Sequence, residues 1–125
     1  MLSDKEAIAT VAVRDLKAAA EFYAGKLGLK EASREGEELI AYHCGNSVLN
    51  VYRSAYAGTN QATAVAWAVG DDIDDVVRAL KAKGVAFEHY DLPGMKLEGD
   101  LYIGGDMKVA WFKDPDGNIL NLVSR

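Results

Sequence analysis

The stretch that decides the fold occupies residues 108–125 and reads KVAWFKDPDGNILNLVSR. Asp114, Pro115 and Gly117 are residue types that a type I turn favours at its first, second and fourth positions. The segments on both sides are rich in β-branched, aromatic and aliphatic residues. The stretch therefore predicts two antiparallel strands joined by a tight turn.

One amide, Asn121, stands in the middle of the apolar second strand. A buried amide needs hydrogen-bond partners. Two interpretations are open: a neighbouring backbone group or a water satisfies Asn121, or this strand faces a cavity that holds a ligand. The rest of the chain bears on that choice.

Composition places the 125-residue chain among ordinary globular domains, with 50% hydrophobic and 26% charged residues. No apolar run approaches the ~20 residues that span a bilayer, and residues 1–6 lack the features of a signal peptide. We therefore expect a cytoplasmic protein without a membrane partner. A net charge of −5 without a basic stripe argues against nucleic acid as a partner. Cys44 is the only cysteine, which excludes an intrachain disulfide and a cysteine-based zinc site.

The second half of the chain repeats the first. Each half has an apolar strand, then an amphipathic helix that begins at an aspartate and ends at a glycine. The corresponding segments are strands 7–13 and 64–69, helices 15–27 and 72–83, and the glycines Gly28 and Gly84. Further strands are expected at 38–44, 47–53 and 85–90.

Internal duplication makes each half one βαβββ module, at about residues 1–56 and 62–125 of a single domain. A module can bury one sheet face under its own helix but not the other. The predicted fold is therefore α+β, with two βαβββ modules that form a cup-shaped mixed sheet around a shared interior.

Four motifs resemble the vicinal oxygen chelate superfamily: VAVRDL at 11–16, EFY at 21–23, LGL at 27–29 and WFKDPDGN at 111–118. That superfamily includes glyoxalase I, bleomycin-resistance proteins, thiol transferases acting on fosfomycin, and extradiol dioxygenases. The resemblance implies a glyoxalase/bleomycin-resistance-like fold with the ligand or metal inside the cup. It does not choose among lyase, transferase, dioxygenase and drug-binding functions.

The metal-dependent members place a His or Glu ligand on the first and last strands of each module. The motifs carry these positions to Ile8, Asn50, Ala64 and Asn121. None of the four supplies an imidazole or a carboxylate, and a neutral amide is a poor ligand for divalent transition metals. We therefore expect no metal and no cofactor at this place. The opposing possibility is a displaced metal site built from His43 and His89.

Strand alternation predicts which side chains line the cavity. Across the tight turn after Cys44, His43 is expected to pair with Val48 and to face inward. Across the second turn, Phe112 is expected to pair with Ile119 and to face inward as well. The side chains expected under the helices are Tyr42, Trp67, Trp111 and Leu120. The predicted ligand-binding residues are Ile8, His43, Asn50, Tyr52, Tyr102, Phe112 and Asn121.

Residues 91–108 depart from the repeat because they are longer than their counterpart and mix glycines with apolar side chains. One interpretation is a strand with flexible ends that packs on a partner subunit. The other is a lid that closes over an apolar ligand and presents Tyr102 to it.

Two functions are consistent with these observations. The first is a metal-free protein of the bleomycin-resistance type that sequesters a small apolar or aromatic ligand, as in antibiotic resistance. The second is an enzyme, a glyoxalase-like lyase, dioxygenase or thiol transferase, with a displaced metal or with His43 as acid/base. We favour the first. Open sheet edges and an open cup further predict a homodimer.

Overall fold

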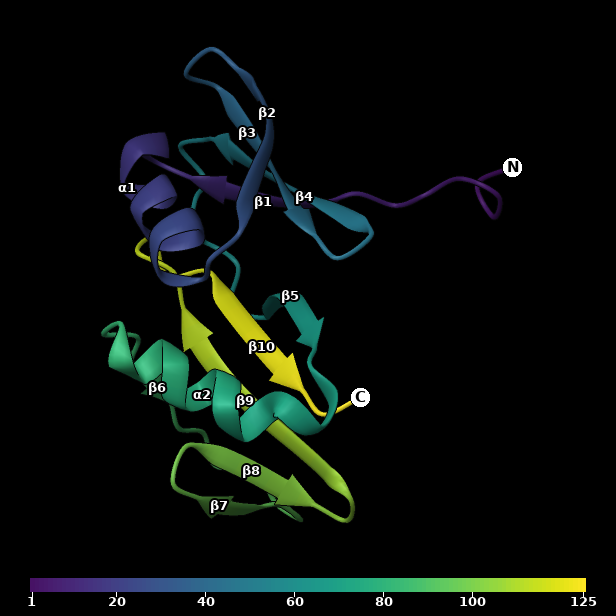
Figure 1. The fold of residues 1–125 in the computed structure, drawn as a ribbon, viewed down its shortest axis with the longest axis vertical. Coiled ribbons are helices and arrows are strands. Elements are labelled where there is room, and N and C mark those ends of the chain that lie inside the picture. Colours follow the sequence, from purple (N-terminus) through teal and green to yellow (C-terminus); the bar gives the residue numbers. More distant parts are fainter. The chain divides into compact units, whose positions relative to one another are not determined.

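The computed structural model describes residues 1–125 as two compact units, Met1–Gly58 (unit 1) and Thr59–Arg125 (unit 2). Figure 1 shows unit 1 in purple to teal and unit 2 in teal to yellow. Each unit has the strand and helix order of a βαβββ module, and unit 2 carries additional short strands. The predicted α+β fold of two modules is confirmed.

Unit 1 is a four-stranded mixed sheet with one helical segment. Its elements are β1 (Ala9–Val13), α1 (Leu16–Ala20), the π-helical η1 (Glu21–Lys26), β2 (Lys30–Glu35), β3 (Leu39–Cys44) and β4 (Ser47–Arg53). The strand order is β1-β4-β3-β2, with β1 parallel to β4 and the other pairs antiparallel. Both predicted helix ends are confirmed: Asp15 accepts a hydrogen bond from the Lys17 N–H (2.9 Å), and Gly28 has a φ of 75°.

The helical segment of unit 1 covers one face of this sheet. The ring of Tyr23 stacks on that of Tyr42 with centroids 6.2 Å apart, and both side chains are buried. Because side chains alternate along a strand, Ile40 lies on the same face as Tyr42, and its partner Val51 does too. This face is the core of unit 1, as the sequence predicts for Tyr42.

Unit 2 is built on a six-stranded sheet. Its elements are β5 (Thr63–Ala68), the 3₁₀ turn η2 (Gly70–Asp72), α2 (Ile73–Ala82), β6 (Phe87–Glu88), β7 (Lys96–Glu98), β8 (Leu101–Gly104), β9 (Met107–Lys113) and β10 (Ile119–Val123). The order is β5-β10-β9-β8-β7, and β6 also pairs with β9. Asp72 is the N-cap residue of α2, as predicted, and its side chain makes no capping hydrogen bond.

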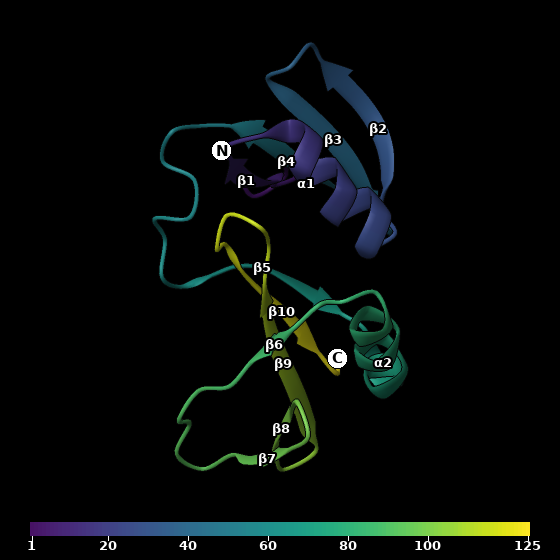
Figure 2. The same ribbon diagram turned by 90° about the vertical axis from the view of Figure 1, so that its left-hand side faces the viewer.

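Helix α2 lies along one side of β9 and β10 (Figures 1 and 2). The Lys108 ammonium is 3.1 Å from the carboxylate of Asp74 in α2, so Lys108 is on the helix-facing side of β9. Alternation along β9 places Ala110 and Phe112 on that side too. Both are almost fully buried, and this face is the core of unit 2.

The strand expected over 85–90 is interrupted. Only Phe87–Glu88 pairs with β9, where Glu88 lies opposite Trp111, and β8 then continues along the same edge, with Tyr102 opposite Val109. Tyr102 therefore takes the place that Tyr90 would have in an uninterrupted strand. We call the intervening residues 89–101 the excursion. Of the predicted lid or strand at 91–108, a large part is β-sheet: β7, β8 and the first residues of β9.

Candidate ligand-binding site

The turn between β9 and β10 decides which side chains share a face. The Gly117 N–H donates to the Asp114 carbonyl (3.0 Å), the Asp114 N–H donates to the Asn118 carbonyl (3.1 Å), and Gly117 has a φ of 90°. This is a type I turn followed by a left-handed residue, which forms a bulge. The additional residue makes Lys113, not Phe112, the partner of Ile119.

A shift of one residue in register moves every side chain of a strand to the opposite face. Phe112 lies opposite Leu120 on the α2 side and is 1% exposed, so the prediction that Phe112 lines the ligand site is wrong. Trp111 lies opposite Asn121 on the other face, so its predicted position under the helix is also wrong. Trp67 stacks on Phe112, with centroids 6.4 Å apart, and lies on the α2 side as predicted.

Asn121 is 5% exposed, and only the nitrogen of its side-chain amide has hydrogen-bond partners. Its Nδ2 donates to the carbonyls of Ala110 (3.1 Å) and Leu122 (3.4 Å). Because both neighbours are acceptors, the nitrogen of the amide must point toward them. The Oδ1 accepts no hydrogen bond and is not fully buried. The backbone uses the donors of Asn121, as the first interpretation has it. An acceptor remains on the face away from α2, and that this face holds a ligand stays a prediction.

Asn121 belongs to a row of side chains that crosses four strands on this face. Cα pairing places Ala66 of β5 beside Asn121, then Trp111 of β9, then Glu88 of β6. We call these four residues the Asn121 row. Ala66 is exposed, whereas Trp111 and Glu88 are half-buried. The row therefore presents a methyl group, an amide oxygen, an indole and a carboxylate in sequence.

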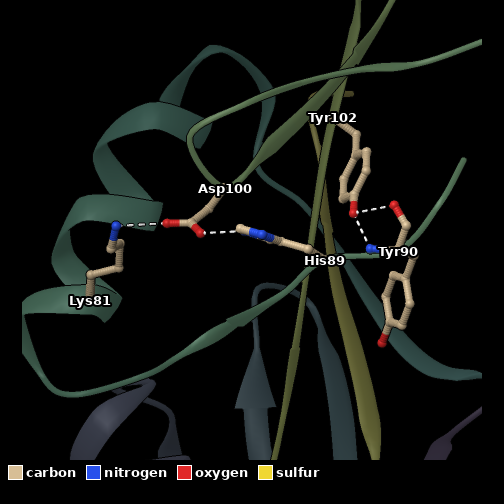
Figure 3. A network of polar contacts seen from close by, with 5 residues as sticks. All are labelled: Lys81, His89, Tyr90, Asp100 and Tyr102. Carbon is tan, nitrogen blue, oxygen red and sulfur yellow. Dashed lines mark hydrogen bonds and ion pairs between the residues drawn. The ribbon is translucent and has the colours of Figure 1, made fainter.

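Two tyrosines brace the indole of Trp111 (Figure 3 labels both). The rings of Tyr90 and Tyr102 pack against it in T-shaped geometry, with centroids at 5.7 and 5.5 Å, and its Nε1 donates to Thr63 Oγ1 (3.1 Å). The Tyr102 hydroxyl accepts from the Tyr90 N–H and donates to the Tyr90 carbonyl (2.7 Å). Tyr102 thus lies in strand β8, on the sheet face that carries Asn121, and not on a lid. Its hydroxyl joins the two ends of the excursion.

At the Glu88 end of the Asn121 row, two side chains of opposite charge form a pair. Lys113 Nζ lies 3.4 Å from Glu88 Oε1, and both side chains are partly exposed. A carboxylate can accept several hydrogen bonds, so one ammonium partner leaves Glu88 with acceptor capacity. Burial, reinforced by the charge of Glu88, raises the pKa of the Tyr90 hydroxyl. That hydroxyl therefore stays neutral at physiological pH.

In unit 1, the predicted pairing of His43 with Val48 is confirmed. His43, Asn50 and Tyr52 alternate onto the face away from α1, and Ile8, which directly precedes β1 and is 57% exposed, alternates to that face as well. His43 and Tyr52 are exposed, and the half-buried Asn50 makes no side-chain hydrogen bond. That this face and the Asn121 face line one shared cavity remains a prediction.

Sequence reasoning missed a histidine with an orienting carboxylate, His89. Its Nε2 lies 2.8 Å from Asp100 Oδ1, and Lys81 of α2 lies 2.7 Å from Asp100 Oδ2 (Figure 3). The hydrogen bond from Lys81, opposed by burial and helped by that from His89, lowers the pKa of Asp100. These contacts fasten both ends of the excursion to α2, on the side away from Asn121.

The residues at the four metal-ligand positions do not fit a transition metal. Ile8 and Ala64 have no donor atom, and the Asn121 nitrogen is committed to backbone carbonyls. No group of three or more His, Cys, Asp or Glu side chains is arranged to hold a metal ion. For the displaced site, His89 already has Asp100 as its partner and lies in a different unit from His43.

None of the helices is long and apolar enough to span a bilayer.

Comparison with known families agrees with this description. A sequence profile of the Glyoxalase/Bleomycin resistance protein/Dioxygenase superfamily matches residues 7–122, and the chain belongs to this superfamily. None of the curated protein sequences with which the chain was compared is similar to it.

Several solved structures share the fold at low sequence identity. A glyoxalase/bleomycin resistance protein/dioxygenase from Alicyclobacillus acidocaldarius is 23% identical, with a TM-score of 0.71 over 96% of this chain and 90% of that one. The lactoylglutathione lyase from Agrobacterium tumefaciens is 17% identical, with a TM-score of 0.71 over 98% and 95%. The fosfomycin resistance protein FosX from Listeria monocytogenes is 16% identical, with a TM-score of 0.68 over 100% and 93%. Likeness at this level establishes the fold and leaves the function to the site.

Proposed function

We propose that the protein is a metal-free small-molecule binding protein of the glyoxalase/bleomycin-resistance type. It holds an apolar or aromatic ligand on the sheet faces that turn away from the helices and acts by sequestration. The observation that supports this most is Asn121. Where metal-dependent relatives carry a ligating side chain, this chain carries an amide whose nitrogen is committed to the backbone and whose oxygen is left to accept a hydrogen bond.

The neighbours of Asn121 suit ligand binding better than metal chemistry. Ligand sites are mostly apolar, with a few fixed polar groups that orient the ligand. Here the half-buried Trp111 is held in place by two tyrosine rings and by Thr63. A rigid indole next to one hydrogen-bond acceptor can bury and orient a ligand without a metal ion.

Metal content tests the metal-free part. The protein is purified with and without added Mn²⁺, Ni²⁺ and Zn²⁺, dialysed, and analysed by mass spectrometry of the elements. We expect well under one equivalent of any transition metal. A stoichiometric metal would overturn the proposal.

A thermal-shift screen of a small-molecule library tests the binding part, because a ligand of the native state raises its apparent stability. For a hit, Asn121→Leu should weaken binding by about 1–3 kcal/mol, since a polar group of the ligand loses its partner. Asn50→Leu, at the corresponding position of unit 1, is the matched control and should have the smaller effect. Equal affinities of wild type and Asn121→Leu would contradict the proposed site.

The enzymatic alternative rests on His43, which lies on the same face as Asn50 and Tyr52. His89 has the better-oriented imidazole, but it lies on the α2 side. If a library hit is converted to a product, His43→Ala should abolish the conversion and weaken binding far less. Binding of library hits without conversion of any of them would favour sequestration.

We further propose that the chain forms a homodimer. Strands β1 and β5 each have a strand partner on one side only, and unpaired edges are commonly covered by a second copy. Light scattering coupled to size exclusion should give twice the chain mass of 13.5 kDa. A monomeric mass at tens of micromolar protein would refute the dimer.

A further inference from the structure

The polar groups of the Asn121 row are acceptors. Both N–H groups of the Asn121 amide face backbone carbonyls, so only Oδ1 is left to meet a ligand. Glu88, on the other side of Trp111, presents a carboxylate, which has no donor when ionised. A ligand that matches this row must therefore bring the hydrogen-bond donors itself.

The surface between these acceptors is an aromatic ring. Trp111 is half-buried, and Tyr90 and Tyr102 fix its orientation. Indole is the ring that attracts cations most strongly, through its electron-rich face, and it also stacks on flat aromatic molecules. A positive charge and a flat ring in one ligand would use both properties.

Space beside Asn121 is provided by β5. Ala66 and Ala68 alternate onto the same face of this strand, and both are exposed. Neighbouring strands lie about 4.8 Å apart, so the row from Ala66 to Glu88 extends roughly 14 Å. A molecule with three fused aromatic rings is shorter than this and fits within the row.

We infer that the ligand of the unit 2 face is a flat aromatic cation with an N–H donor, which lies along the Asn121 row with the donor on Asn121 Oδ1 and its charge over Trp111 and near Glu88. The inference rests on the proposed function and names the class of ligand. Lys113, the cation on this face that pairs with Glu88, opposes such a ligand and is therefore a useful control. An anionic ligand of the same shape would face the amide oxygen and the carboxylate and be repelled.

Three fluorescent probes with one ring system test this inference. At pH 7.5, 9-aminoacridine is a cation with N–H donors, acridine is neutral, and acridine-9-carboxylate is an anion. Fluorescence titration of the full chain should give an affinity for 9-aminoacridine at least tenfold above that for acridine. Acridine-9-carboxylate should bind most weakly of the three.

Variants of the row assign the preference to its residues. Asn121→Leu should weaken 9-aminoacridine binding at least fivefold, whereas the matched Asn50→Leu in unit 1 should have the smaller effect. Glu88→Gln, at a partly exposed position, should reduce the ratio of affinities for 9-aminoacridine and acridine. Lys113→Gln should increase that ratio, because it removes the cation that competes for Glu88. Circular dichroism of each variant checks that it is folded.

The outcomes separate this inference from the proposed function. If the three probes bind equally, or the anion binds best, or Glu88→Gln and Lys113→Gln leave the ratio unchanged, the aromatic-cation assignment is wrong and the binding function stands. If none of the probes binds, the assignment is also wrong. The proposed function then depends on the library screen and the metal analysis alone.

Discussion

The two units place an asparagine at the centre of the same kind of sheet and surround it differently. In unit 1 the row across the strands is Thr10, Asn50, Ala41 and Ser33. In unit 2 the corresponding row is Ala66, Asn121, Trp111 and Glu88. One row is small and weakly polar, and the other contains a large aromatic ring and a charge. The two units thus share the strand arrangement and the central asparagine, and only unit 2 combines the asparagine with an aromatic surface.

The two hairpins behind these rows also differ. In unit 1 a tight turn joins β3 to β4, with Gly45 at a φ of 56° and Cys44 paired with Ser47. In unit 2 the longer turn carries the bulge at Gly117, which changes the register by one residue. A single left-handed residue therefore decides that Trp111, and not Phe112, lies beside Asn121.

Asp114 should show the largest difference in stability between the two turns. Its carboxylate accepts hydrogen bonds from the N–H groups of Asp116 and Asn118, both at 2.9 Å, and from Asn118 Nδ2 at 2.8 Å. Asp114→Ala should lower the free energy of unfolding by about 2–3 kcal/mol, because buried donors lose a charged acceptor. In unit 1, Asn46→Ala at an exposed turn position should change it by less than about 0.5 kcal/mol. Urea denaturation measures both, and equal effects would refute the special role of the second turn.

Two buried tyrosines should respond to the same substitution with opposite signs. The Tyr102 hydroxyl bonds both the N–H and the carbonyl of Tyr90, whereas the Tyr42 hydroxyl is buried without a partner. Tyr102→Phe should destabilise the protein by about 1–2 kcal/mol, since it leaves backbone groups unpaired. Tyr42→Phe should be neutral or stabilise by up to about 1 kcal/mol, since it removes an unpaired polar atom. Destabilisation by both variants in urea would contradict this contrast.

The smallest effect on stability is expected for Asp100, whose carboxylate fastens the excursion of unit 2 to α2. The pKa of Asp100 is lowered in the folded state, chiefly by the hydrogen bond from Lys81, so its contribution is present above the ordinary value of 3.8. The contribution is lost as the pH falls from that value through the lower pKa of the folded state. Because Lys81 is 55% exposed, Asp100→Asn should cost about 0.5–1 kcal/mol at pH 7 and little in strong acid.

The control for this pH dependence is Asp75→Asn. Asp75 pairs with Arg78 at 2.7 Å, but both side chains are more than 70% exposed. Denaturation at a series of pH values should show almost no loss at pH 7 for this variant. If Asp100→Asn is as harmless as Asp75→Asn at neutral pH, the excursion is not held by this contact.

Much of the candidate site in unit 1 could be predicted from the sequence. The two-residue turn allows one register, and alternation then places His43 with Val48 and Tyr42 under the helix, as observed. In unit 2 the predicted faces of Phe112 and Trp111 are wrong, because the left-handed Gly117 adds one residue to the loop and shifts the register. The sequence Asp-Pro-Asp-Gly-Asn did contain the signal, since a glycine after a type I turn is typical of a bulge.

The excursion could not be predicted in the same way. No local pattern in residues 85–104 indicates that Tyr102 replaces Tyr90 opposite Val109, or that His89 meets Asp100. Tyr90 and Tyr102 are 12 residues apart, and His89 and Asp100 are 11 residues apart. The strength of these contacts depends on groups supplied by α2 and β9. Periodicity within a strand carries no information about such contacts.

The sequence by itself determined the two βαβββ modules, the ends of both helices, and the absence of His, Cys or carboxylate side chains at the four metal-ligand positions. These features follow from local rules: hydrophobic period, capping, glycine conformation and side-chain chemistry. The tertiary structure alone decided which way the Asn121 amide points, which aromatic ring lies beside it, and how the excursion is held. These depend on register and on hydrogen bonds between distant segments, which form only when the sheet and helix α2 are assembled.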